Sequence, residues 1–102
     1  FTGGDAPLRR EILLQFMASD ETDAAELRQA LTGEDCNVIA KSAHRVKGAS
    51  RMIGAQPYAN VAERIERAGR DSDLTAARAC RADLEREQAR LAAYLQSETS
   101  ET

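Results

Sequence analysis

The residues that could do chemistry in this chain gather around its single histidine, His44, which begins the run HRVKGAS over residues 44–50. Lys47 follows three residues later and Gly48 four residues later. On a helix, residues three and four apart are neighbours, so these three residues would share one face. That face would offer a titratable nucleophile, a cation able to offset a negative charge, and backbone cleared of a side chain.

Lys47 and Gly48 each favour a phosphate site on this face. Helical side chains lean toward the N-terminus, so the Lys47 ammonium could reach a phosphoryl group attached to the imidazole and offset its close to two negative charges. A glycine inside a helix costs about 1 kcal/mol relative to alanine, so Gly48 indicates a need for close approach beside His44. The alternatives are a solvated surface lysine and a glycine that lets a neighbouring helix pack close.

The spacing of apolar residues and the helix-end signals predict a chain built from helices. Five are expected, over residues 6–18, 21–32, 36–53, 57–68 and 73–96, with a polar tail over 97–102. Because the connections are short, sequential helices should pack antiparallel. We therefore expect residues 1–102 to form one all-α domain, an up-and-down antiparallel four-helix bundle with a short additional N-terminal helix across one end.

Local signals give the expected helix ends and the orientation of the third helix. The residues expected to cap or end helices are Asp5, Ser19-Asp20, Gly33, Asp35, Gly54, Gly69 and either Asp71 or Ser72. The third helix should turn one stripe to the core, consisting of Ile39, Ala43, Val46, Ser50 and Ile53. His44 is rotated by about 100° from that stripe, so it should be held rigidly and still be reachable.

Composition argues against several other functions. The net charge of −3 indicates no basic surface for binding nucleic acid. The chain has only two phenylalanines and two tyrosines and no tryptophan, so it offers no platform on which bases could stack. No uncharged stretch is long enough to span a membrane, and no signal-peptide pattern opens the chain. With no second histidine, no nucleotide-binding loop and no nucleophile–base arrangement, we expect no metal site and no autonomous kinase activity. Cys36 and Cys80 fit two free thiols in a reduced compartment, or a disulfide in a secreted domain.

The run HRVKGASRMIG over 44–54, continued by VAERIE over 61–66, resembles the histidine-containing phosphotransfer (HPt) domain family. These are phosphorelay modules often found at the C-terminus of hybrid sensor histidine kinases, and the helix pattern resembles theirs over nearly the whole chain. The finer resemblance is to the domains that end virulence-type hybrid sensors of Gram-negative bacteria. The abrupt start at Phe1 and the polar end also lead us to expect a piece of a longer protein.

The resemblance implies roles for individual residues. His44 would be the phosphoacceptor, through the ring nitrogen that faces solvent, while Lys47 would steady the phosphoryl group and Gly48 would leave room for the partner. Many relatives orient the imidazole through an amide on the next helix, and that position here is Glu66. Its carboxylate could accept a hydrogen bond from Nδ1–H, or could simply pair with Arg70 in solvent.

We therefore expect a phosphorelay intermediate that accepts a phosphoryl group on His44 from a receiver-domain aspartate and passes it to another receiver aspartate. Its partners would be the receiver domains of response regulators and of the parent hybrid kinase. No cofactor is expected in this domain, and Mg²⁺ would come with the receiver. Candidates for the docking surface are Ala40, Ala43 and Arg51, and Arg51 is also a candidate for assisting the phosphate.

The isolated domain is expected to be a cytoplasmic monomer without nucleic-acid or direct membrane contact, belonging to a sensor protein that could sit in the inner membrane. Two alternatives remain open. One is the dimerisation and phosphoacceptor part of a histidine kinase, and the other is a structural helical bundle in which His44 is incidental.

Overall fold

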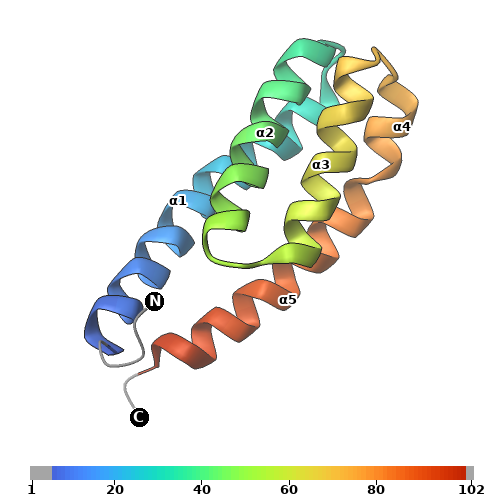
Figure 1. The fold of residues 1–102 in the computed structure, drawn as a ribbon. Helices are drawn as coiled ribbons and strands as arrows, with labels where there is room; N and C mark the ends of the chain where they lie inside the picture. Colours follow the sequence, from blue (N-terminus) through green and yellow to red (C-terminus); the bar gives the residue numbers. More distant parts are fainter. Residues whose placement is uncertain (1–5, 101–102) are drawn as a thin grey trace.

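The computed structural model describes residues 6–100, and these form helices joined by short turns without any strand. The helices are α1 (Ala6–Thr32), α2 (Cys36–Met52), α3 (Gln56–Arg70), α4 (Leu74–Ala79) and α5 (Arg81–Thr99). Figure 1 shows α1, α2, α3 and the α4–α5 pair running alternately in opposite directions as four rods. The expected all-α, up-and-down antiparallel bundle is therefore confirmed.

The two N-terminal helices expected over 6–18 and 21–32 form a single helix, α1. The prediction of a separate short N-terminal helix is therefore wrong. Neither Ser19 nor Asp20 is a helix-breaking residue such as proline or glycine. Asp20 points into the bundle instead of capping a new helix. The Tyr58 hydroxyl donates to Oδ1 of Asp20 at 2.9 Å, and Nε2 of Gln88 donates to Oδ2 at 3.3 Å. The other expected cap in this region, Asp5, lies outside the residues that the structure describes.

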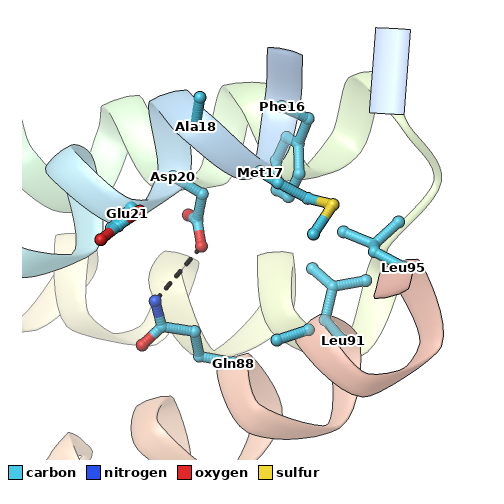
Figure 2. Close-up of a pocket in the computed structure, with 9 residues that line it drawn as sticks. Phe16, Met17, Ala18, Asp20, Glu21, Gln88, Leu91 and Leu95 are labelled. Atoms are coloured by element: carbon cyan, nitrogen blue, oxygen red, sulfur yellow. Dashed lines mark hydrogen bonds between the residues drawn. The ribbon is translucent and has the colours of Figure 1, made fainter. Parts of the chain in front are cut away.

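Asp20 lies at the polar end of a cavity of about 300 Å³ between α1 and α5. Figure 2 shows the Asp20–Gln88 hydrogen bond at one end and apolar side chains at the other. The apolar wall is formed by Phe16, Met17, Leu91 and Leu95. Burial raises the pKa of Asp20, although the hydrogen bonds from Tyr58 and Gln88 oppose this effect.

Helix α2 begins where the sequence predicts. Asp35 is its N-cap, and its Oδ1 accepts from the backbone N–H groups of Asn37 at 3.0 Å and Val38 at 3.3 Å. The helix is followed by Gly54, whose φ of 76° lies in the left-handed region that favours glycine. The buried residues of α2 include the expected stripe members Ile39, Ala43, Val46 and Ser50.

Gly69 lies inside α3 instead of ending it, because the helix continues to Arg70. A Cβ atom at Gly69 would lie 2.9 Å from the carbonyl oxygen of Cys36 and 3.1 Å from Cβ of Ala40, both on α2. No side chain fits there without a shift, so the glycine permits a close approach between α2 and α3. Among the helices described, these two make the most extensive contact, and they lie side by side in Figure 1.

The last expected helix, over 73–96, is divided at Cys80, whose N–H donates to the carbonyl of Ala77 in a tight i→i−3 bond. Its cap is Asp73, which accepts from the N–H of Ala76 at 3.0 Å, so the expected cap at Asp71 or Ser72 is wrong. Helix α5 extends to Thr99, so the start of the expected polar tail is helical, while 101–102 lie outside the described residues.

Candidate functional site

Helix α2 presents His44 at the edge of the bundle, as its position beside the core stripe predicts. Its neighbour Ala43 is fully buried, and Val46, two residues on, is buried as well. The His44 side chain is nevertheless 62% exposed. The backbone is thus fixed by packing on one side while the imidazole remains open to solvent on the other.

Glu66 of α3 approaches the same imidazole from below the surface. Its side chain is only 4% exposed, and His44 Nδ1–H donates to its Oε2 at 2.9 Å. Arg70, one turn further along α3, donates to the same oxygen at 2.5 Å. The two roles that the sequence left open for Glu66, contact with His44 and pairing with Arg70, therefore occur together.

The charge state of Glu66 determines which imidazole nitrogen is available. Burial alone would raise the pKa of Glu66, but the ion pair with Lys47, the hydrogen bond from His44 and the charge of Arg70 outweigh it and hold the pKa below its usual range. An ionised carboxylate can only accept hydrogen bonds, so the neutral imidazole carries its hydrogen on Nδ1. The Nε2 atom is then left with its lone pair.

Lys47 is held close to His44 by the same carboxylate. Its ammonium lies 2.5 Å from Glu66 Oε1, and the side chain is 15% exposed. The alternative of a freely solvated lysine is therefore wrong. In this structure its ammonium is paired with the same carboxylate that contacts His44.

Gly48 has a different role from Gly69. A Cβ atom built at Gly48 would meet nothing within 4 Å, so no neighbouring helix in the described part of the chain requires a glycine here. The alternative that Gly48 allows close packing of another helix is therefore wrong. A glycine in mid-helix still costs about 1 kcal/mol relative to alanine, and no close contact within residues 6–100 accounts for its presence here.

The remaining candidates lie at the margin of the site or outside it. Arg51 is exposed, and its guanidinium lies 3.4 Å from Oε1 of Glu63, so the structure does not bring it into the His44–Glu66 group. Ala43 is fully buried and cannot belong to a docking surface, which corrects that expectation. Ala40 is partly exposed and lines the same shallow depression as His44.

A family model described as the Hpt domain matches residues 11–96 of the chain. The chain belongs to the Hpt domain family. Hpt domains carry out phosphotransfer in two-component signalling and interact with receiver domains. Among curated proteins and among solved structures, no significant match was found.

Arg70 is the member of this Hpt domain's candidate site that the sequence did not predict. In the sequence, a Glu66–Arg70 pair is typical of a solvated helix face. The helix expected over 57–68 also ended before Arg70. A signal was nevertheless present: Ala62 and Gly69 flank Glu66 at i−4 and i+3, and small residues at these positions indicate a close helix contact. Arg70 lines both the depression beside His44 and a second one beside Lys47.

Within residues 6–100, no group of three or more histidine, cysteine or acidic side chains could hold a metal ion. Cys36 and Cys80 are both free thiols. None of the helices described is both long and apolar enough to cross a membrane.

Proposed function

We propose that this Hpt domain is a phosphorelay intermediate, in which His44 accepts a phosphoryl group from a receiver-domain aspartate and later passes it to another receiver aspartate. The observation that carries this proposal is the contact between His44 Nδ1–H and the buried, ionised Glu66. It leaves a lone pair on Nε2 of an exposed imidazole, which is what a nucleophile requires.

The transfer itself requires little covalent machinery from this chain. The Nε2 lone pair attacks phosphorus, and a nitrogen–phosphorus bond forms as the aspartyl oxygen–phosphorus bond breaks. The bonding electron pair leaves with the aspartate carboxylate of the donor. The Nδ1 hydrogen stays in its bond to Glu66, which stabilises the positive charge that develops on the ring. Passing the group to the next receiver aspartate reverses these steps.

The other residues assist the charge and the access of the partner. Lys47 exchanges Glu66 for the incoming phosphoryl oxygens and offsets their charge. Gly48 gives the receiver close access, which agrees with the open space above it. We assign the Mg²⁺ of the reaction to the receiver.

We place the domain at the C-terminus of a cytoplasmic part of a hybrid sensor kinase and expect it to act as a monomer. The resemblance of residues 44–54 to such modules supports this placement. The four rods of the bundle are completed within one chain, which favours this function over a helical hairpin that must dimerise.

The test is phosphorylation of the purified domain by phosphoramidate and by a phosphorylated receiver. We expect an acid-labile, base-stable label on wild type and none on His44→Gln, because His44 is the only histidine. Lys47→Gln should slow labelling by about tenfold, since one charge-assisted contact to the phosphoryl group is lost. Arg64→Gln is the matched control, because Arg64 pairs with Asp83 of α5 at 2.9 Å, away from His44. Label that survives in His44→Gln would overturn the proposal.

A further inference from the structure

We propose that Arg70 is a positioning residue of the phosphotransfer site: it offsets the charge of Glu66, so that a carboxylate can hold His44 without repelling the phosphoryl group. The proposal rests on the proposed function of His44. It explains how this chain uses a carboxylate where a neutral hydrogen-bond acceptor would avoid any conflict of charge.

The conflict arises from the position of Glu66. Its Oε2 lies 2.9 Å from Nδ1 of His44, and its side chain is 4% exposed, so little water screens its charge. A phosphoryl group on Nε2 brings close to two further negative charges to the other side of the same ring. A carboxylate in this position would therefore oppose phosphorylation unless cations compensate for it.

Lys47 alone does not provide enough compensation. Its ammonium neutralises Glu66 from Oε1, at 2.5 Å, which leaves the pair without net charge. If Lys47 then turns toward the phosphoryl group, Glu66 loses its partner at the moment when negative charge arrives. A second cation is required to keep Glu66 ionised and paired throughout the transfer.

Arg70 has the position and the freedom to be that cation. Its guanidinium donates at 2.5 Å to Oε2, the same oxygen that accepts from His44 Nδ1–H, so it fixes this atom against the imidazole. With Lys47 and Arg70 both in place, the group formed with Glu66 carries one net positive charge before any phosphoryl group arrives. The Arg70 side chain is 66% exposed and lines the depressions beside both His44 and Lys47.

The experiment compares wild type with Arg70→Gln, Arg70→Lys, Glu66→Gln and the double variant Glu66→Gln/Arg70→Gln. Arg64→Gln is the control, because it removes another arginine of α3, one that is ion-paired with Asp83 of α5. The rate of phosphohistidine formation from phosphoramidate is measured by ³¹P NMR at low and high salt, after circular dichroism has shown that each variant is folded. The carboxyl ¹³C signal of Glu66 is titrated in the same samples.

We expect Arg70→Gln to slow phosphorylation by about fivefold at low salt, and by less at high salt, because salt screens charge interactions at this exposed side chain. Arg70→Lys and the double variant should return to within about twofold of wild type, since one restores the cation and the other removes the charge that needs it. Arg70→Gln should also raise the pKa of Glu66 toward its usual value, because Arg70 is one of the charges that lower it. Arg64→Gln should change none of these quantities.

Three results would overturn the role of Arg70. The first is an Arg70→Gln rate equal to that of Arg64→Gln, and the second is a double variant no faster than Arg70→Gln. The third is a Glu66 titration that does not move in Arg70→Gln. If wild type itself forms no phosphohistidine, the proposed function fails, while the titration still decides whether Arg70 offsets the charge of Glu66.

Discussion

Gly69 and Ala40 bring α3 and α2 closer together than two ordinary side chains would allow. A Cβ atom at Gly69 would lie 3.1 Å from Cβ of Ala40. This contact lies one helical turn from the bond between His44 and Glu66, because Ala40 precedes His44 by four residues and Gly69 follows Glu66 by three. The reach of the buried carboxylate to the imidazole therefore depends on a glycine in the neighbouring turn.

Gly69→Ala should destabilise the domain by about 1–3 kcal/mol, because the added methyl group forces the two helices apart. The same shift should weaken the His44–Glu66 bond and slow phosphorylation of His44. Urea unfolding measures the stability, and labelling by phosphoramidate measures the second effect. A Gly69→Ala variant as stable as wild type would contradict the close contact.

Gly48→Ala is the matched substitution, and it should have the opposite effect on stability. Its methyl group meets no atom within 4 Å, so the variant should gain about 0.5–1 kcal/mol from the better helix propensity of alanine. Transfer from a phosphorylated receiver should slow, whereas labelling by the small donor phosphoramidate should not. Equal slowing with both donors would show that Gly48 does not act through access of the partner.

Glu66→Gln should reveal a stability contribution that is lost in acid. The pKa of Glu66 is lowered in the folded state, so the ionised form stabilises the fold above the unfolded value of 4.5, and this contribution disappears as the pH falls through the folded value. Wild type should exceed the variant by about 1 kcal/mol near neutral pH, with the difference shrinking below that unfolded value. Urea unfolding across this pH range measures the difference, and an advantage that grows in acid would contradict the assignment.

Asp20→Asn should give the opposite pH trend. Burial raises the pKa of Asp20 in the folded state, so its contribution to stability is fully present below the unfolded value of 3.8 and is lost as the pH rises through the folded value. The stability of wild type relative to Asp20→Asn should therefore fall between acidic and neutral pH. The same unfolding series tests this, and a difference that does not change with pH would show that Asp20 is not perturbed by burial.

The bundle could be predicted from local pattern wherever local and long-range forces agree. The stripe of α2 and its cap Asp35 follow from a helical period and a side chain that bonds to N–H groups two and three residues on. The break expected at Asp20 did not occur, because its partners Tyr58 and Gln88 lie 38 and 68 residues further along the chain. A capping signal read locally does not register such partners.

The residues of the candidate site also fall into those that local sequence predicts and those that it does not. His44, Lys47 and Gly48 share a helix, so their spacing alone placed them on one face. The burial of Glu66 and the contribution of Arg70 depend on how closely two helices approach, which no single helix encodes.

The commitment of Nδ1 to Glu66 has a consequence for the regiochemistry of the product. An imidazole can be phosphorylated on either nitrogen, giving two isomers with different chemical lifetimes. In this domain the buried carboxylate of Glu66 blocks Nδ1, because an Nδ1-linked product would require breaking the hydrogen bond between His44 and Glu66. Under the proposed function, the helix pair therefore selects one isomer, the Nε2-linked one, before any partner arrives.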